Sequence, residues 1–290
     1  MPNNMEPKIL LIGGGYLGSR IAEFLQAEVV DIGEIDITEL ESVERVVAAK
    51  KPTHVINAAA MANTADLEKP EMKTLGYRVN VQGPANLALV AERQDFHLTH
   101  ISTGMLFDGA GADGQGVKET DLPTPNNYYC WTKAWADAQL LPLHSDRVLI
   151  TRIHTPLSRF DSPKNYLTKL RGFTKVVDAP QSLTIVEDLL VTLKALLEQR
   201  ATGIYNVVNP GAMSAWDIVE LMKKHGLVPA DKEVAKMTRA ELDAQVAANG
   251  GAQQTFPILA TEKLARAGII LPEVHEAVEQ AILNFVHAGS

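Results

Sequence analysis

The sequence predicts an α/β protein in which a doubly wound parallel sheet is followed by a smaller C-terminal α/β lobe. Short apolar runs suited to buried strands alternate with helix-like segments as far as Ile153, and a glycine-rich turn follows the first run. From Pro156 this alternation gives way to segments containing Pro and Ser. We therefore expect a first domain over residues 1–155, which also receives the segment of about 181–208, and a smaller interleaved lobe over 156–290.

Composition narrows the class of protein. The chain has 290 residues, of which 46% are hydrophobic and 21% charged, as in ordinary globular proteins. A formal net charge of −8 without a long basic run argues against a nucleic-acid surface. The single cysteine, Cys130, excludes an internal disulfide and suits a reducing compartment. Neither a signal sequence nor an apolar run of about 18 residues is apparent, so we expect a cytoplasmic protein that does not enter a membrane.

The turn after the first predicted strand carries a dinucleotide-binding signal. The run Lys8–Ile12 is too short for a helix, and Gly13-Gly-Gly-Tyr-Leu-Gly18 follows it directly, before a helical pattern. This G-x-G-x-x-G in a strand–turn–helix context predicts a Rossmann-like domain, in which helix amides meet a pyrophosphate. A purely structural turn is the alternative. The residues expected to bind the cofactor here are Gly13, Gly15, Tyr16, Leu17 and Gly18.

An acidic residue lies near the end of the second predicted strand, over 28–32. At such a position, Asp31 can accept hydrogen bonds from both ribose hydroxyls of the adenosine half and would repel a 2′-phosphate. The cofactor is therefore expected to be NAD or NADP, with NAD slightly favoured. Arg20 is an argument for NADP, because its side chain could pair with that phosphate. Alternatively, Asp31 is a turn residue at the strand end.

The remaining elements follow from periodicity and from Gly and Pro breaks. Strands are expected over 55–60, 98–103, 148–153 and 203–208, and helices over 38–50, 75–93, 185–199, 214–224, 238–248 and 273–286. The stretch 109–118 is rich in glycine. Ser102 and Thr103 end a predicted parallel strand, which is where open α/β sheets bind ligands. His97 and His100 suit strand positions better than metal ligation, and no metal site is expected.

A Tyr-x-x-x-Lys pair begins the helix after residue 126. Tyr129 and Lys133 are four residues apart, so on a helix they lie on one face, one turn apart. A nearby ammonium favours the phenolate and lowers the pKa of the phenol, which makes Tyr129 a candidate general acid or base. The spacing alone also suits an ordinary solvated helix face.

Taken together, these motifs resemble the extended short-chain dehydrogenase/reductase superfamily. The shared patterns are the glycine turn, Asp36-Ile37, Asn57-Ala58-Ala59, Val79-Asn80, Ser102-Thr103 and Tyr129-x-x-x-Lys133, which cover residues 8–156. Ser102-Thr-Gly-Met-Leu-Phe-Asp-Gly109 is similar to the Ser-Thr-Asp-x-x-Phe-Asp-Gly of the dTDP-4-dehydrorhamnose reductase branch. Segments at 163–169, 175–177, 181–185 and 202–211 resemble the plant-type bifunctional 3,5-epimerase/4-reductases most closely.

The resemblance implies hydride transfer from a nicotinamide to the keto group of a nucleotide-linked 4-keto-6-deoxy sugar. Tyr129 would donate the proton, Lys133 would tune it and bind the nicotinamide ribose, and Thr103 would hold the carbonyl oxygen. Asn80 would support Lys133 through backbone or water, or else pack helix against strand. Further cofactor contacts are implied for Asp36, Ile37, Ala58 and Ala59. The implied substrate-binding residues, for which solvated or capping roles are the alternative, are Met105, Asn165, Lys169, Lys175 and Ser182.

Two departures from the resemblance affect the prediction. The glycine turn is one residue tighter than is usual in extended members, so cofactor preference is not carried over. The bifunctional enzymes pair a Cys with a lysine at the position of Lys175, whereas this chain has Met105, whose thioether has no proton to exchange. We therefore expect reduction without epimerisation. The alternatives are a bifunctional 3,5-epimerase/4-reductase, an epimerase or dehydratase that retains its cofactor, and a non-catalytic NAD(P)-binding subunit like the methionine adenosyltransferase β subunit.

The resemblance also implies an assembly. Members of the superfamily form homodimers, and we expect one here. Trp131 and Trp135, on the predicted Tyr129 helix, are candidate contacts between subunits, although either could equally be a core residue.

Overall fold

The computed structural model describes residues 7–111, 113–143 and 146–287. The chain forms two compact units, which are described separately here. Unit 1 comprises Met1–Ser102, Asn127–Thr151 and Leu193–Tyr205, and unit 2 comprises Thr103–Asn126, Arg152–Thr192 and Asn206–Ser290. In the described part of the chain, no helix combines the length and the hydropathy that a membrane span requires.

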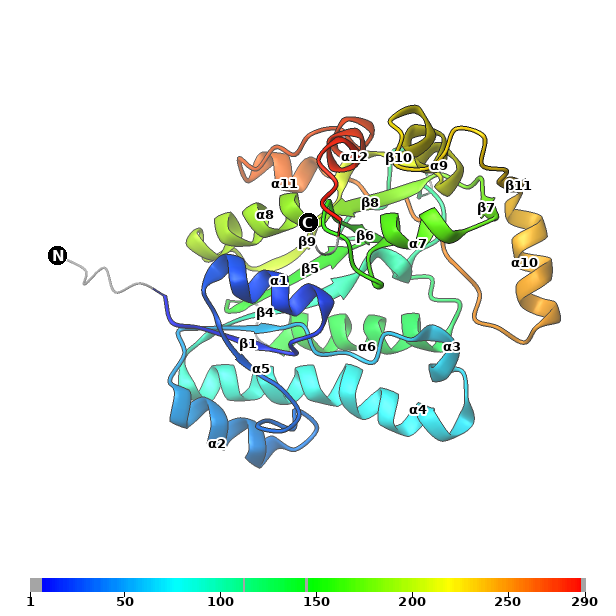
Figure 1. Cartoon of the computed structure of the whole chain (residues 1–290). Coiled ribbons are helices and arrows are strands. Elements are labelled where there is room, and N and C mark those ends of the chain that lie inside the picture. Colours follow the sequence, from blue (N-terminus) through cyan, green and yellow to red (C-terminus); the bar gives the residue numbers. More distant parts are fainter. Residues whose placement is uncertain (1–6, 112, 144–145, 288–290) are drawn as a thin grey trace. The chain divides into compact units, whose positions relative to one another are not determined.

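A six-stranded parallel sheet confirms the predicted α/β fold class (Figure 1). Its order is β2 (Glu28–Val30), β1 (Ile9–Ile12), β3 (His54–Asn57), β4 (His97–Thr103), β5 (Val148–Ile153) and β9 (Gly203–Asn206). β1 pairs in parallel with β2 on one side and β3 on the other, so the winding direction reverses between β1 and β3. Ligands of doubly wound sheets bind at such a switch point, beyond the carboxyl ends of the strands.

Helices cover both faces of this sheet (Figure 1). On one face lies α1 (Tyr16–Leu25), and on the other lie α2 (Leu40–Lys50), α5 (Gly83–Gln94) and α6 (Tyr128–Leu143). The core of unit 1 consists of apolar side chains from the sheet and from α2, α5 and α6, such as Leu10, Val55, Leu87 and Leu140. The alternation of these elements is the one that the sequence pattern predicted.

The helical region that we expected at 75–93 starts earlier and changes pitch within its length. After the short α3 (Thr64–Leu67), α4 (Pro70–Tyr77) begins with a proline near its N-terminus and leads into a π-helical segment, η1 (Arg78–Gln82), and then into α5. A Cβ atom at Gly83 would lie 2.6 Å from Ile37 Cδ1, so a glycine is needed where α5 packs on Ile37. The predicted start of this region was therefore wrong by five residues, because Pro70 suits the first turn of a helix.

Unit 2 is built on smaller sheets. One has the order β10 (Asn209–Met213), β8 (Gln181–Ile185) and β6 (Pro156–Leu157), and the other pairs β11 (Ala235–Met237) with β7 (Lys175–Val177). Its helices are α7 (Tyr166–Gly172), α9 (Ala215–Lys224), α10 (Arg239–Ala248), α11 (Glu262–Arg266) and α12 (Val274–Leu283). The helix α8 (Val186–Glu198) gives its first half to unit 2 and its second half to unit 1.

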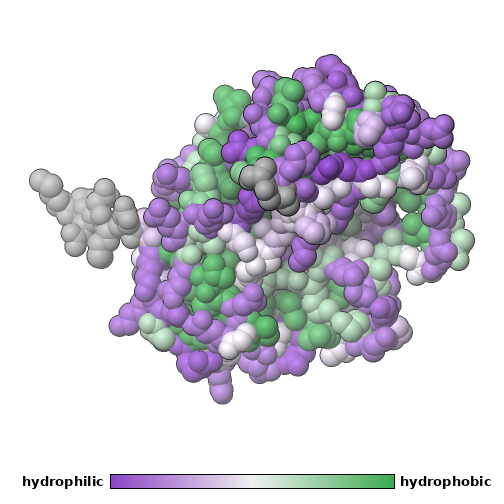
Figure 2. Space-filling view, in the orientation of Figure 1, coloured by the Kyte–Doolittle hydropathy of each residue, from purple (hydrophilic) through white to green (hydrophobic). Residues whose placement is uncertain are grey.

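The two compact units do not have the same residue boundaries as the domain and the lobe expected over 1–155 and 156–290. Residues 193–205 lie in unit 1, and residues 181–192 lie in unit 2. Residues 103–126 also lie in unit 2, where Gly109 and Val117 form bridges with Pro257 and Leu259. This long-range pairing leaves no signal in the local sequence. On the face shown in Figure 2, hydrophilic side chains cover much of the surface, and hydrophobic ones gather in patches between them.

Candidate active site

The glycine turn after β1 packs directly against the turn after β3. Gly13 has φ +97°, and a Cβ atom there would lie 2.6 Å from the backbone nitrogen of Ala59. A Cβ atom at Gly18 would lie 1.9 Å from the Gly13 carbonyl oxygen, so α1 can only approach the turn with a glycine at this position. These glycines bring the N-terminus of α1, with Tyr16 and Leu17, next to Ala58 and Ala59 at the switch point.

Asp31 lies directly after β2 and contacts the same turn. Its Oδ2 accepts the backbone N–H of Gly14 at 3.2 Å, and its Oδ1 accepts that of Ile32 at 3.0 Å. The side chain is exposed. An exposed carboxylate held beside the glycine turn is placed as a ribose-binding acidic residue would be.

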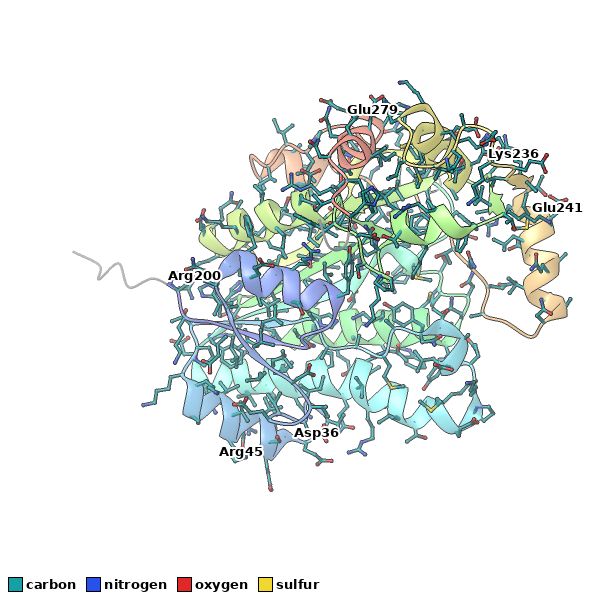
Figure 3. All side chains as sticks on the ribbon, in the orientation of Figure 1. Asp36, Arg45, Arg200, Lys236, Glu241 and Glu279 are labelled. Atoms are coloured by element: carbon teal, nitrogen blue, oxygen red, sulfur yellow. The ribbon has the colours of Figure 1, made fainter. Side chains whose placement is uncertain are left out.

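Asp36 and Ile37 lie in the loop that leads into α2, and Asp36 lies near Arg45 of that helix (Figure 3). Asp36 Oδ1 accepts both the backbone N–H and the hydroxyl of Thr38, at 2.9 and 2.8 Å. Ile37 is buried in the core and packs on Gly83. The contacts of both residues thus stabilise this loop.

Three contacts fix the start of α6, which carries Tyr129 and Lys133. The Asn127 side chain accepts the backbone N–H of Cys130 at 2.9 Å, Glu68 accepts that of Tyr128 at 2.7 Å, and the Tyr128 hydroxyl donates to the Lys73 carbonyl at 2.8 Å. Tyr129 itself is 9% exposed, so the solvated-face alternative does not describe it.

Lys133 is buried at 1% exposure, where a charged group is costly. Its Nζ lies 2.9 Å from His100 Nε2 and donates to the Ile101 carbonyl at 2.9 Å. Burial lowers the pKa of Lys133 to about 8, against the opposing charge of Asp137. Burial, together with the charge of Lys133, also holds the pKa of His100 well below its ordinary value. A lysine that titrates near neutral pH is a common feature of catalytic sites.

Asn80 lies in the π-helical segment with its amide fully engaged. Its Oδ1 accepts the backbone N–H of Met61 at 2.8 Å, and its Nδ2 donates to the Met61 carbonyl at 2.9 Å and to the Thr132 hydroxyl at 3.0 Å. The Thr132 hydroxyl in turn donates to the Tyr129 carbonyl at 2.7 Å. Asn80 therefore holds the turn after β3 against α6, and it meets the residue before Lys133 rather than Lys133 itself.

Thr103 and Met105 belong to unit 2. The Thr103 hydroxyl accepts the backbone N–H of Met105 at 3.2 Å and so caps the short 3₁₀ turn Gly104–Leu106. The Met105 side chain is half-buried. Thr103 therefore does act as a cap at the strand end, which was the alternative role. Because its hydroxyl oxygen only accepts in this contact, the hydroxyl proton can still be donated to another acceptor.

The other expected substrate residues also lie in unit 2 and fall into two kinds. Asn165 is buried and caps α7, and its amide also bonds the backbone of Ser158 and Phe160. Ser182 is buried too, and its hydroxyl accepts the Leu259 N–H at 2.9 Å. Lys169 and Lys175 are exposed. The capping alternative therefore describes Asn165, whereas the two lysines keep accessible ammonium groups.

A family model for the RmlD substrate binding domain matches residues 7–286. The chain belongs to this family. Among its curated relatives, a trifunctional UDP-glucose 4,6-dehydratase/UDP-4-keto-6-deoxy-D-glucose 3,5-epimerase/UDP-4-keto-L-rhamnose-reductase of Arabidopsis thaliana is 31% identical over 228 residues, which are 75% of this chain and 34% of that protein. The bifunctional dTDP-4-dehydrorhamnose 3,5-epimerase/dTDP-4-dehydrorhamnose reductase of the same organism is 29% identical over 220 residues, 73% and 72% of the two chains.

Solved structures show the same fold. The L780 UDP-rhamnose synthase of Acanthamoeba polyphaga mimivirus superposes with a TM-score of 0.86 at 24% identity, covering 95% of this chain and 99% of that one. The dTDP-4-dehydrorhamnose reductase of Bacillus anthracis, in complex with NADP, has a TM-score of 0.82 at 24% identity, covering 97% and 99%. The chain thus has the fold of RmlD-type reductases, although it spans only about a third of the trifunctional plant relatives.

In this RmlD-family chain, the sequence analysis assigned no role in the site to three buried polar residues around Lys133. They are Asn57, whose Nδ2 lies 3.2 Å from His100 Nδ1, His100 itself, and Asp137, whose Oδ1 accepts the Ser102 hydroxyl at 2.7 Å. Two signals were available. His100 is two residues before Ser102 and so points to the same side of β4, and Asp137 is one helical turn beyond Lys133.

The described residues offer no side chains that are suited to metal or thiol chemistry. These contain no group of three or more His, Cys, Asp or Glu side chains that could hold a metal ion. Cys130 is buried, and burial raises the pKa of its thiol to about 12, so the reactive thiolate is disfavoured.

Proposed function

We propose that this chain is an NAD(P)H-dependent reductase of the keto group of a nucleotide-linked 4-keto-6-deoxy sugar. The observation that carries the proposal is the buried Lys133, with its pKa lowered to about 8, one helical turn after Tyr129 on α6. The names of its relatives support the substrate class, since they include dTDP-4-dehydrorhamnose reductases and 4-keto-6-deoxy-sugar reductases.

The cofactor fits the glycine turn. Gly13 and Gly18 leave no space for side chains of their own, which allows close backbone approach to a pyrophosphate at the N-terminus of α1. Asp31 accepts from the ribose hydroxyls of the adenosine half, which favours NAD slightly over NADP. The other proposed contacts are Gly15, Tyr16, Leu17, Asp36, Ile37, Ala58, Ala59 and Lys133.

The reduction needs a hydride and a proton. When bound, the nicotinamide would supply the hydride, and negative charge would develop on the carbonyl oxygen of the sugar. Tyr129 donates its hydroxyl proton to that oxygen, and the ammonium of Lys133 stabilises the phenolate that remains. Thr103 donates a hydrogen bond to the same oxygen. Asn80 positions α6 through Thr132.

We further propose that reduction proceeds without epimerisation. Met105 is a thioether, so it can neither remove nor return the protons at C3 and C5 of the sugar. Lys175 remains exposed on β7 without the cysteine that would be its partner, and Lys169 or Arg171 is a candidate partner for the substrate diphosphate. The bifunctional alternative draws support from the names of the plant relatives, and it requires solvent deuterium to appear at C3 or C5 of the product.

A homodimer is proposed through the outer surface of α4 and α6. Tyr77, Trp131 and Trp135 are 41%, 45% and 39% exposed, and the ring centroid of Trp135 lies 6.1 Å from that of Tyr77 and 5.7 Å from that of Trp131. Exposed, contiguous aromatic rings are typical of protein interfaces. We also propose a reducing, cytoplasmic setting, in keeping with the single buried cysteine.

The proposal is tested by following the absorbance of NADH or NADPH with a UDP- or dTDP-linked 4-keto-6-deoxy sugar. We expect oxidation of the nicotinamide coupled one-to-one to the formation of a 4-hydroxy sugar. If the protein binds NADH or NADPH but oxidises neither with the UDP-linked or the dTDP-linked sugar, the proposed enzymatic activity is contradicted and a regulatory subunit is favoured.

A further inference from the structure

The Lys133 amine rests on a side chain that the proposed reaction does not use. His100 on β4 lies between two partners, with its Nε2 2.9 Å from Lys133 Nζ and its Nδ1 3.2 Å from Asn57 Nδ2. His100 is 1% exposed and Asn57 is 0% exposed. Because both side chains are buried, neighbouring protein groups determine which ring nitrogen of His100 carries the proton.

Asn57 selects the tautomer of His100. The Asn57 Oδ1 accepts the backbone N–H of Ala59 at 3.1 Å, which turns its amide nitrogen toward His100. An amide nitrogen donates hydrogen bonds and does not accept them, so His100 Nδ1 must be the acceptor. The proton of the neutral ring then lies on Nε2, directed at Lys133. This assignment follows from the hydrogen-bond network as a whole.

We propose that His100 is a positioning residue for Lys133. It holds the amine in place and disfavours the ammonium form of the lysine. The Nε2–H bond presents its positive end to Nζ, which disfavours an ammonium there. When Lys133 becomes an ammonium, the Nε2 proton of His100 passes to Nζ and one proton from solvent binds Nδ1, so the imidazole ring stays neutral. That proton then faces the N–H of Asn57, so the hydrogen bond from Asn57 to His100 is lost when the lysine is protonated.

The groups around Lys133 act in opposite directions. From α6, Asp137 lies one turn after Lys133 and its charge favours the ammonium, and Tyr129 lies one turn before. From β4, His100 opposes the ammonium, and Ser102 donates its hydroxyl to Asp137. Burial lowers the pKa of Lys133 to about 8 against the charge of Asp137. If the proposed reduction is correct, His100 thereby sets the pH at which Tyr129 loses the support of a positive charge.

The tautomer is read directly by NMR of the ligand-free full chain with ¹⁵N-labelled histidine. At pH values above the pKa of Lys133, we expect the His100 proton on Nε2. As the pH falls through about 8, the proton-bearing nitrogen should become Nδ1. A proton on Nδ1 throughout, or an imidazolium at pH 7, would overturn the proposal. Because no substrate is present, this result does not depend on the reductase activity.

A double-mutant cycle separates this role from a structural one. Asn57→Ser gives His100 Nδ1 an acceptor, and the titration of Lys133, followed with ¹³Cε-labelled lysine, should rise by about one pH unit. In a His100→Leu background, or His100→Phe if that variant folds better, the same change should have no effect. Asn86→Ser, which removes a partly buried amide contact of unit 1, to the Ile37 carbonyl, is the matched control and should not move the titration. An unchanged titration in Asn57→Ser, or an equal shift without His100, would refute the proposal.

Discussion

Gly13 and Ala59 lie so close that a Cβ atom on Gly13 would come within 2.6 Å of the Ala59 nitrogen, and Gly13 has φ +97°. This contact joins the turns after β1 and β3 at the point where the sheet reverses its winding. This close approach requires that residue 13 has no side chain, so a substitution that adds a Cβ atom there tests it.

Gly13→Ala should destabilise the protein by at least about 1–2 kcal/mol, because alanine is strained at this φ and its Cβ meets the turn after β3. Gly15→Ala is the matched control, since a Cβ there has no atom within 4 Å and its φ is −67°. Denaturant unfolding measures both. Equal losses in the two variants would show that the contact with Ala59 has no special weight.

Asp31→Ala should shift the cofactor preference toward NADP by roughly tenfold, because it removes a carboxylate that repels the 2′-phosphate and binds the ribose hydroxyls. The ratio of kcat/KM for NADPH to that for NADH measures the shift. Glu34→Ala, which removes a carboxylate of the same loop that pairs with Lys50, is the comparison and should leave the ratio unchanged. An unchanged ratio in the Asp31 variant would remove Asp31 from the cofactor site.

Stability should fall as the pH drops from about 6.5 to about 4. Burial lowers the pKa of both His54 and His154 to about 4, from an ordinary 6.5. Between these values the unfolded chain binds protons that the folded protein does not, so folding loses roughly 3 kcal/mol per histidine by pH 4. His154→Gln should flatten the dependence of unfolding free energy on pH, and His275→Gln on α12 controls for removing a histidine. An equally steep dependence in His154→Gln would contradict the neutral buried ring.

Trp131→Glu should convert the proposed dimer to monomer, because it puts a charge into the aromatic surface of α4 and α6. Light scattering after size-exclusion chromatography measures the mass. Val191→Glu, at an exposed apolar site on α8, is the control and should leave the mass unchanged. A wild-type chain that is already monomeric at micromolar concentration would exclude this interface.

The part of the site that sequence predicted is the part encoded by local spacing. The glycine turn, the strand ends and the Tyr129–Lys133 turn each follow from residues close together in the chain. The π-helical segment holding Asn80 was not predicted, because its pitch depends on packing against α6 and the turn after β3.

Residues whose partners are distant in sequence could not be assigned. His100 was expected to be an ordinary strand residue, yet its contacts with Asn57 and Lys133 come from two other elements of unit 1. The 103–126 segment was expected in the first domain, whereas it pairs with residues 257–259 of unit 2. For Asn165, in unit 2, the sequence left a substrate-binding role and a capping role open. Its side chain caps α7 at the Leu167 N–H and also bonds the backbone of Ser158 and Phe160.

The measurement that tests the central claim most directly is the turnover of Tyr129→Phe with a reduced nicotinamide and a 4-keto-6-deoxy sugar nucleotide. Removal of the phenolic oxygen should lower kcat by about 10²–10⁴ while the Kd for the dinucleotide stays within about twofold. Tyr128→Phe is the matched control on the same helix turn, since it loses only a hydrogen bond to the Lys73 carbonyl and should keep its turnover. A Tyr129→Phe enzyme as active as the Tyr128→Phe control would contradict the assignment of Tyr129 as the proton donor.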